Sequence, residues 1–239
     1  MRRLIGIVGG LGPLASTRFL SSIYRQFRDV PEQQTPRIVL YSDPTFPDRT
    51  THFLRGEEDE ILAQAVRTTE SLLTLGVDHL LFCCYTIHRI APRLPAHVLE
   101  RFVSLLDLAV DAGLESQGKV LLLCTNGTRK LRLFEGARKW SLLADRVSFP
   151  TDAEQPAVHQ ILYDLKKNCD PVEAFERLSR LLGGHQVDQW LLGCTELHLL
   201  SNVRAGDRRA DFTPKLLDPL QRAADMIKDD SLYQATYSG

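Results

Sequence analysis

Short apolar runs alternate along the chain with longer segments in which apolar residues recur every three or four positions. The short runs have the length of buried strands, and the segments at about 14–27 and 57–75 have the period of amphipathic helices. Candidate strands are 4–8, 37–41, 79–83, 119–124, 146–149 and 189–193. Strands that alternate with helices in this way predict an α/β protein with mainly parallel sheets flanked by helices.

One motif occurs twice. An apolar run that ends in Cys84 and is followed by His88 recurs 110 residues later, where a similar run ends in Cys194 and is followed by His198. Each run is typical of a buried parallel strand, and catalytic groups of open α/β sheets gather at the carboxyl ends of such strands. We therefore predict two similar lobes related by a pseudo-twofold axis, with the active site in the cleft between them.

The lobe boundaries follow from a second repeat. Leu105-Leu106-Asp107 precedes a helical segment in the first half, and Leu216-Leu217-Asp218 precedes one in the second half. The last segment is expected to return to the first lobe, because it matches the segment that leaves it. The predicted N-terminal lobe is therefore 1–104 plus 212–239, and the predicted C-terminal lobe is 105–211.

Composition narrows the class of protein. The 239 residues carry a net charge of −1, so there is no basic field to bind nucleic acid or an anionic membrane surface. No apolar stretch approaches the roughly 20 residues of a membrane span. Five cysteines, an odd number without a C-x-x-C pair, favour a reducing compartment over a disulfide framework. We expect a cytoplasmic protein that binds a small molecule.

Cys84 and Cys194 are the strongest candidates for chemistry. A thiolate serves as base or nucleophile, and a helix N-terminus lowers the pKa of a thiol from about 8.5. Thr86 and Thr195 follow the two cysteines and place hydroxyls beside backbone N–H groups that suit a carboxylate. Two opposed thiols could remove a proton from one face of a carbon and return one to the other face. Buried cysteines are also common as small core residues, which is the alternative.

Other polar residues carry weaker signals. His88 and His198 lie one helical turn beyond the cysteines, where they could tune the thiols or serve as packed or capping histidines. Arg49 stands in a proline-rich segment, 42–51, that predicts a stiff loop, and Lys166 stands on a predicted helix; both could bind a carboxylate or be surface charges. The cysteines and histidines lack zinc spacing, so no metal is expected.

The turn Gly10-Leu11-Gly12-Pro13-Leu14-Ala15 formally matches a dinucleotide-binding fingerprint. Pro13 argues against that function, because it removes a backbone N–H from the first helical turn, where a pyrophosphate would bind. A tight turn at Gly10, Leu11 and Gly12 that lets the backbone approach a small ligand is the favoured interpretation.

Taken together, these segments resemble the aspartate/glutamate racemase superfamily, and most of all its aspartate racemase branch. Residues 46–50 resemble a Pro-Asp-Arg-Thr loop, residues 84–88 a Cys-Asn-Thr-Ala-His motif, and residues 193–197 a Gly-Cys-Thr-Glu-Leu motif. The other matching segments are 5–13, 125–128 and 163–166.

The resemblance implies a two-base racemase that needs no cofactor, has two α/β lobes and forms a homodimer. It implies that Cys84 and Cys194 alternate as acid and base. Thr86, Thr128 and Thr195 would surround the α-carboxylate of the substrate, and Arg49 and Lys166 would bind its distal carboxylate. The remaining substrate contacts that it implies are Gly10, Leu11, Gly12, Tyr85 and Glu196.

Three residues depart from the family pattern. Tyr85 replaces an asparagine expected to contact the substrate, Asp43 replaces a common asparagine, and His198 replaces a usual proline. The expected substrate is therefore an acidic or polar amino acid, with aspartate as the first candidate. The alternatives are a related isomerase or decarboxylase acting on a carboxylic acid, a non-catalytic small-molecule sensor on the same scaffold, and a thiol redox switch.

Overall fold

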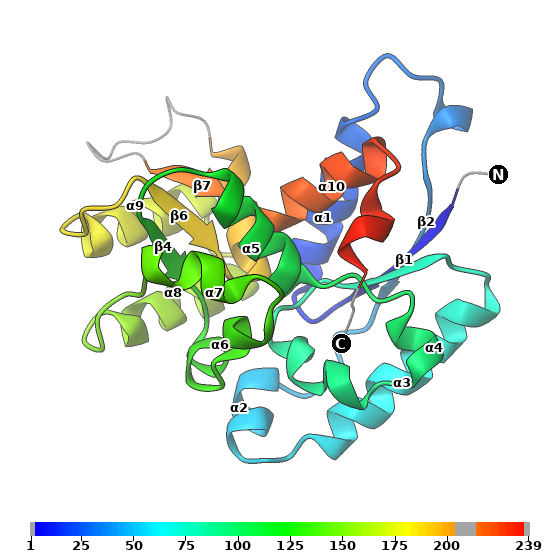
Figure 1. The fold of residues 1–239 in the computed structure, drawn as a ribbon, viewed down its shortest axis with the longest axis horizontal. Helices are drawn as coiled ribbons and strands as arrows, with labels where there is room; N and C mark the ends of the chain where they lie inside the picture. The colour runs from blue at the N-terminus through cyan, green and yellow to red at the C-terminus, as the bar shows by residue number, and fades with distance from the viewer. Residues whose placement is uncertain (1–2, 204–213, 237–239) are drawn as a thin grey trace.

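The structure, a computed structural model, describes residues 3–203 and 214–236 and contains two parallel sheets flanked by helices (Figure 1). The first sheet has the order β2-β1-β3 and the second the order β5-β4-β6-β7, and every pairing is parallel. The strands are β1 (Leu4–Gly9), β2 (Arg37–Ser42), β3 (His79–Phe82), β4 (Val120–Leu123), β5 (Val147–Ser148), β6 (Gln189–Leu192) and β7 (Lys215–Leu217). The predicted two-lobe α/β fold is confirmed.

Helices cover both sheets. The longer α-helices are α1 (Pro13–Arg25), α3 (Asp59–Thr74), α5 (Leu105–Glu115), α8 (Gln155–Lys166), α9 (Pro171–Leu182) and α10 (Pro219–Lys228). The shorter ones are α2 (Arg49–Leu54), α4 (Ala96–Leu99), α6 (Asn126–Lys130) and α7 (Trp140–Leu143). The 3₁₀ helices are η1 (Glu32–Gln34), η2 (Thr86–Arg93), η3 (Leu133–Gly136), η4 (Ala144–Arg146), η5 (Thr195–Asn202) and η7 (Leu232–Ala235). None of the helices within the described residues combines the length and apolar character needed to span a membrane.

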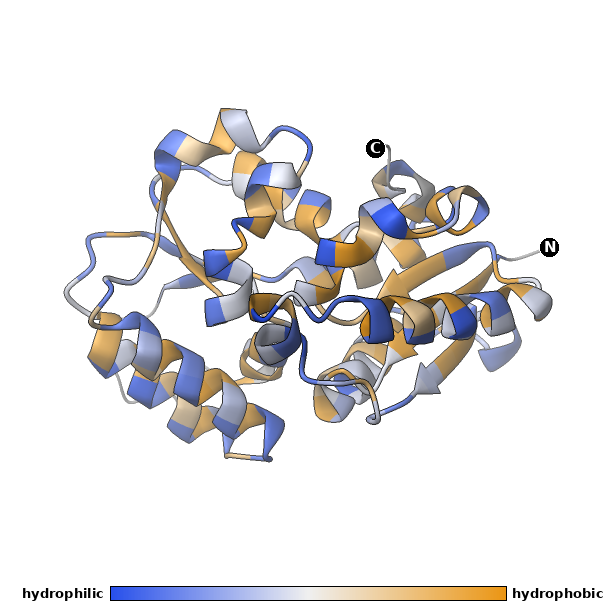
Figure 2. Ribbon diagram, turned by 90° about the horizontal axis from the view of Figure 1, so that it is seen from below, coloured by the Kyte–Doolittle hydropathy of each residue, from blue (hydrophilic) through white to orange (hydrophobic). Residues whose placement is uncertain are grey.

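The hydrophobic core joins the two lobes. One cluster contains buried residues of both sheets, such as Ile7 and Leu81 from the first and Leu122 and Leu191 from the second. Figure 2 shows hydrophobic residues along strands and helices in which hydrophobic and hydrophilic residues alternate, as in amphipathic helices that bury one face. The two lobes are therefore packed on one another through a continuous apolar region.

Two helices cross between the lobes. Helix α5 packs against β6, β7 and α7 of the second lobe, whereas α10 packs against α1 of the first lobe and against α5. In Figure 1, α10 and α1 run together between the two sheets. Helix α10 therefore lies against elements of both lobes.

The predicted lobe boundary at 211–212 lies outside the described residues and needs one correction. Residues 212–239 were assigned to the first lobe, but β7 pairs with β6 through Lys215↔Gln189 and Leu217↔Leu191. The chain therefore leaves the second lobe only after residue 217. Strand β7 has only three residues, Lys215–Leu217, and so short a run gave no sequence signal of a strand.

Two local predictions also change. The segments after Cys84 and Cys194 are 3₁₀ helices, η2 and η5, and not α-helical turns. The predicted loop at 42–51 ends early, because Asp48 caps α2 by accepting a hydrogen bond from the Thr51 N–H at 2.8 Å. Arg49 therefore stands in the first turn of a short helix, and its backbone is fixed by that cap.

Candidate active site

One cavity lies between the carboxyl ends of the strands of the two lobes. It is lined by Leu11, Arg49, Thr50, Cys84, Tyr85, Thr86, Thr125, Thr128, Lys166, Gly193, Cys194, Thr195 and Glu196. Its free volume is about 10 Å³, which is the room of one water molecule. The structure is therefore a closed form, and an amino acid enters only if the lobes or the lining side chains move.

The cavity gathers ten of the twelve residues selected from the sequence. Gly10 and Gly12 do not line it, although both lie in the turn beside Leu11. The sequence reasoning missed Thr50, Thr125 and Gly193. Each of these three is next to a selected residue or within the same short motif, so adjacency was the signal that could have found them.

Matching strands deliver the two cysteines. Cys84 follows the end of β3, and Cys194 follows β6 after Gly193, whose N–H donates to the Leu123 carbonyl at 2.8 Å. Both thiols are buried, with exposed fractions of 7% for Cys84 and 6% for Cys194, and both residues line the cavity. The duplicated motif thus brings two thiols from different lobes to one enclosed space.

The environment of Cys194 is dominated by Glu196. The Cys194 thiol donates a hydrogen bond to Oε2 of Glu196 at 2.9 Å, and the Thr195 hydroxyl donates to the same oxygen at 3.3 Å. Burial and the negative charge of Glu196 raise the pKa of Cys194 well above the usual value of a thiol, and Lys166 opposes this shift. Cys194 is therefore held as a protonated thiol in this closed form.

The turn at Gly12 makes room for Glu196. A Cβ atom at position 12 would collide with Oε1 of Glu196. The φ angle of Gly12 is 179°, so the close approach of the Glu196 carboxylate, and not backbone strain, requires glycine here. Gly10 has a φ of +83° and packs against the backbone of Asp43. Gly12 thus contacts the site indirectly, through Glu196.

Several polar atoms of the cavity residues have no partner. Nε of Arg49, the hydroxyl of Tyr85 and Oε1 of Glu196 are buried without a hydrogen bond. Buried polar groups are normally satisfied, and an unsatisfied one calls for an explanation such as a ligand. Two donors and an acceptor around one cavity are suited to a small zwitterion or anion.

Arg49 is fixed by the backbone around it. Its Nη1 donates to the carbonyls of Phe46 and Pro47 at 3.1 and 2.7 Å, and its Nη2 donates to the carbonyl of Leu11 at 2.6 Å. The guanidinium therefore holds the loop before α2 against the Leu11 turn. Nε makes no hydrogen bond, and Nη2 keeps a second N–H, so these two N–H groups are the ones left for a ligand.

Lys166 brings a positive charge from the last turn of α8. Its Nζ lies 4.1 Å from the centre of the Tyr163 ring, and the Tyr163 hydroxyl donates to Oδ2 of Asp48 at 2.8 Å. Burial lowers the pKa of Lys166, but the negative charge of Glu196 acts in the opposite direction, and the net result is a raised pKa. No carboxylate within the described part of the chain forms a salt bridge with it.

Hydroxyl groups bridge the lobes at the other side of the cavity. Thr86 of the first lobe shares a hydrogen bond of 3.2 Å with Thr128 of the second, and Thr128 shares one of 3.1 Å with Thr125. Thr125 is the N-cap of α6 and accepts from the Thr128 N–H. These hydroxyls are neutral donors that can turn towards a carboxylate.

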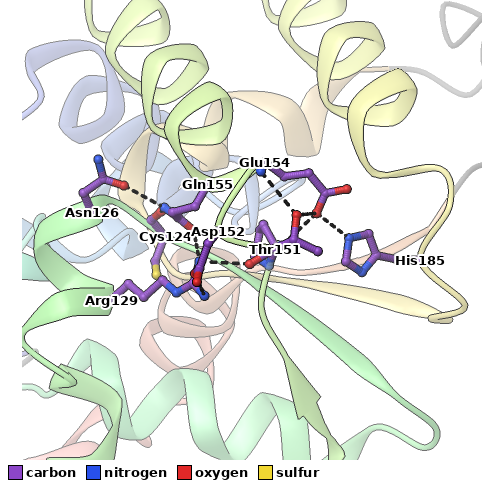
Figure 3. A network of polar contacts seen from close by, with 9 residues as sticks. Cys124, Asn126, Arg129, Thr151, Asp152, Glu154, Gln155 and His185 are labelled. Carbon is purple, nitrogen blue, oxygen red and sulfur yellow. Dashed lines mark hydrogen bonds and ion pairs between the residues drawn. The ribbon is translucent and has the colours of Figure 1, made fainter.

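A buried glutamine supports this turn from behind (Figure 3). Gln155 donates to the Cys124 carbonyl at 3.0 Å and to Oδ1 of Asn126 at 3.2 Å, and its Oε1 accepts from Arg129 at 3.3 Å. The start of α8 is thereby tied to the start of α6, the helix that carries Thr128.

Tyr85 fills space between the lobes. Its ring stacks on Phe134 of the second lobe, with centroids 5.7 Å apart and an interplanar angle of 23°. Burial raises the pKa of Tyr85 well above the usual value of a phenol, so the hydroxyl is neutral. This side chain contributes to the small volume of the cavity.

The two histidines beyond the cysteines do not contact the thiols. The His88 ring bonds to the Tyr85 carbonyl and the Leu105 N–H, and the His198 ring bonds to Ser22 and Asp218. They are therefore packed and capping groups, as the alternative to thiol tuning predicted. The Asp43 carboxylate is also occupied elsewhere, by Thr45 and Gln64, and does not line the cavity.

Comparisons with known proteins identify the family. The sequence model of the Asp/Glu/Hydantoin racemase family matches residues 8–227. An aspartate racemase from Picrophilus torridus is 24% identical, with a TM-score of 0.81 over 96% of this chain and 94% of that one. An aspartate racemase homologue from Pyrococcus horikoshii is 21% identical, with a TM-score of 0.69 over 97% and 99% of the two chains.

A glutamate racemase from Bacillus anthracis is more distant, at 14% identity and a TM-score of 0.64, and is matched over 98% of this chain and 83% of that one. At these identities the three structures establish the shared fold. The family match spans nearly the whole described chain and includes both cysteine turns. The chain therefore belongs to the Asp/Glu/Hydantoin racemase family.

Proposed function

We propose that this protein is an amino-acid racemase that needs no cofactor and uses Cys84 and Cys194 as acid and base. The observation that carries the proposal is the pair of buried thiols, delivered by matching strands to one polar cavity. Membership of a racemase family supports the same reaction class. No cofactor is needed for this reaction, because a thiolate and a thiol on opposite sides of the α-carbon can together invert its configuration.

The reaction would proceed by two proton transfers. One thiolate removes the α-proton, so the Cα–H bond breaks and its electron pair moves towards the α-carboxylate. The opposite thiol then gives its proton to the other face of the carbon. At the end the two sulfurs have exchanged protonation states, and proton exchange with water restores the starting form. A closed cavity assists both steps by excluding water from the carbanion.

The two thiols would start in different states. Glu196 holds Cys194 protonated in the closed form, so we assign Cys84 as the first base and Cys194 as the first acid. Glu196 would also take part in resetting Cys194, because its carboxylate is within hydrogen-bond distance of the sulfur.

The substrate class follows from the charges around the cavity. Thr86 and Thr128 supply neutral donors for the α-carboxylate, while Lys166 and Nε of Arg49 supply positive and donor groups for a second, distal carboxylate. Aspartate is the first candidate, and the aspartate racemase from Picrophilus torridus is a relative in fold. The small cavity favours a short side chain over a long one. We also propose that the chain acts in the cytoplasm as a homodimer.

A non-catalytic sensor is the second candidate, and one observation favours it. Tyr85 stacks on Phe134 and lines the cavity, whose free volume is about 10 Å³. A protein whose cavity admits an amino acid without exposing its α-carbon to both sulfurs would bind without turnover.

Exchange of the α-proton in D₂O tests the proposal. Wild type, Cys84→Ala and Cys194→Ala are incubated with a panel of L- and D-amino acids without added cofactor, and exchange and chirality are followed by NMR and chiral chromatography. Racemisation of one amino acid, lost in both variants, is the expected result. Binding of a panel member by calorimetry without exchange or racemisation would contradict the racemase and favour the sensor.

A further inference from the structure

The helix that follows Cys194, η5, is of a type that depends on tertiary contacts for its stability. Thr195 and Glu196 begin η5, a 3₁₀ helix of eight residues. Runs of 3₁₀ helix longer than three or four residues are uncommon, because their hydrogen bonds have poor geometry. The position of the Glu196 carboxylate, and with it the hydrogen bond to Cys194, therefore depends on what holds η5 in place.

His198 ties η5 to two helices through side-chain hydrogen bonds, and Ser201 of η5 adds a second hydrogen bond to Oδ2 of Asp218 at 2.5 Å. Its Nδ1–H donates to Oδ2 of Asp218 at 2.6 Å, and its Nε2 shares a hydrogen bond of 2.9 Å with the Ser22 hydroxyl. Oδ1 of Asp218 accepts from the Leu220 and Gln221 N–H groups and so caps α10. One buried ring therefore joins η5 of the second lobe to α1 and to the start of α10.

The hydrogen bond between His198 and Ser22 lies towards the C-terminal end of α1. Helix α1 lies along η5, and at its first end Gly12 fits against the Glu196 carboxylate. At the other end of the contact Ser22 meets His198. Glu196 and His198 are only two residues apart in the first half of η5, so a change at His198 shifts Glu196 relative to α1 and to the space where Cys84 lies.

The first lobe contains a related arrangement. Nδ1–H of His88 donates to the Tyr85 carbonyl at 3.0 Å, and Nε2 accepts from the Leu105 N–H at the start of α5 at 3.0 Å. Each cysteine turn is thus linked by a histidine four residues later to the first turn of a helix that crosses between the lobes. The repetition of this link in both halves argues that it serves the cysteine turns and is not an accident of packing.

Ser22, His198 and Asp218 have the atomic order of a Ser–His–Asp triad, but a nucleophilic role does not fit. Ser22 is 4% exposed and lies inside α1. Free backbone N–H groups that could hold an oxyanion occur at the ends of helices and not within them. The ring therefore serves position and not covalent chemistry.

We propose that His198 is a positioning residue that sets the geometry of Cys194 through η5 and Glu196, and that Asp218 fixes its ring. The proposal rests on the proposed function for its kinetic consequence. Its defining feature is selectivity: His198 affects the proton transfer made by Cys194 and not the one made by Cys84.

The test compares three variants of the full chain. His198→Leu removes both ring hydrogen bonds, and His198→Asn keeps an amide N–H near the place of Nδ1. His185→Asn is the matched control, because His185 forms a histidine–carboxylate contact of 2.8 Å with Glu154 in the same lobe (Figure 3), and neither residue lines the cavity. The primary isotope effect is measured with α-deuterated L- and D-substrate.

We expect His198→Leu to lower kcat about 100-fold, within the range of general acid–base contributions. It should raise the isotope effect for only one enantiomer, the one whose α-deuteron Cys194 removes. His198→Asn should recover at least about tenfold of the loss, and His185→Asn should leave both isotope effects unchanged. Equal isotope effects for both enantiomers in His198→Leu would overturn the proposal, since loss of folded protein alone lowers activity without changing them.

A second readout does not depend on racemisation. The rates of iodoacetamide alkylation at Cys194 and at Cys84 are measured by peptide mass spectrometry in wild type and in His198→Asn. A changed ratio of the alkylation rates of Cys194 and Cys84 supports the positioning role. This readout holds even if no substrate is turned over, and it does not require His198→Leu to fold. An unchanged ratio contradicts it, whatever the outcome for the proposed function.

Discussion

The Cys194 thiol donates a hydrogen bond to the Glu196 carboxylate at 2.9 Å, and this contact makes the two cysteines unequal. No side-chain hydrogen bond to the Cys84 sulfur occurs in the described part of the chain, although both thiols are buried to the same degree. The pseudo-twofold repeat therefore supplies two similar thiols, of which only Cys194 is hydrogen-bonded to a carboxylate within the described residues.

Removing the charge of Glu196 should make Cys194 more acidic. Glu196→Gln keeps the size of the side chain and replaces a carboxylate that opposes ionisation with an amide that can donate to a thiolate. We expect the pKa of Cys194 to fall, and its alkylation at pH 8 to become about tenfold faster. The pH dependence of iodoacetamide labelling, read at each cysteine, measures this. An unchanged Cys194 profile would show that Glu196 does not control the thiol.

Lys166 should bind the distal carboxylate of the substrate. Lys166→Met removes the ammonium and keeps the length of the chain, so KM for an acidic amino acid should rise about 10–100-fold, the value of a hydrogen bond to a charged group. Lys167→Met is the matched control, because Lys167 is the exposed neighbour on the same helix end. Steady-state kinetics of both variants decide the matter, and an equal effect of the two substitutions would rule out a specific contact.

Gly12 should be needed for the site more than for the fold. In Gly12→Ala the new methyl group meets Oε1 of Glu196 and displaces the carboxylate. Overpacking of this kind costs about 1–3 kcal/mol of folding free energy, and activity should fall further than this loss explains. Gly136→Ala is the control, since a Cβ there meets nothing within 4 Å. Urea unfolding and activity are compared, and full activity in Gly12→Ala would contradict the account of the turn.

His88 should make stability sensitive to acid. Burial lowers the pKa of His88 from 6.5 to about 4, so between these pH values the unfolded chain binds a proton that the folded chain does not. Stability therefore falls as the pH is lowered through this range, by about 2 kcal/mol between pH 7 and pH 5 from this group. In His88→Gln, whose amide oxygen can accept from Leu105 N–H, that loss should be absent. Urea unfolding at the two pH values measures the difference; equal losses in both proteins would refute the assignment.

The sequence was enough to predict the two lobes and the ends of the strands that carry the cysteines. Parallel strands buried on both faces leave continuous apolar runs, and a duplication makes the second run a check on the first. The contacts of Arg49 could not be predicted in the same way. Its guanidinium bonds to three carbonyls, one of them 38 residues away at Leu11, and no local pattern encodes such a contact.

Tertiary packing also determines what the sequence left open at Tyr85 and His198. Tyr85 stacks on Phe134 from the other lobe, and His198 pairs with Asp218 at the start of α10. Both departures from the family pattern were visible in the sequence as single residues. Their partners lie 49 and 20 residues away, so their effect on the site became clear only from the folded arrangement.

The central claim, that two thiols act on opposite faces of one carbon, is tested most directly by the position of deuterium early in the reaction. Wild type converts a single enantiomer of its substrate in D₂O, and product and remaining substrate are separated and analysed by mass spectrometry at low conversion. The account predicts deuterium at the α-carbon of the product and almost none in the recovered substrate, because the product takes its hydrogen from the opposite, solvent-exchanged thiol. Product that retains the original α-proton, or equal deuterium in both enantiomers, would contradict two-base catalysis by Cys84 and Cys194.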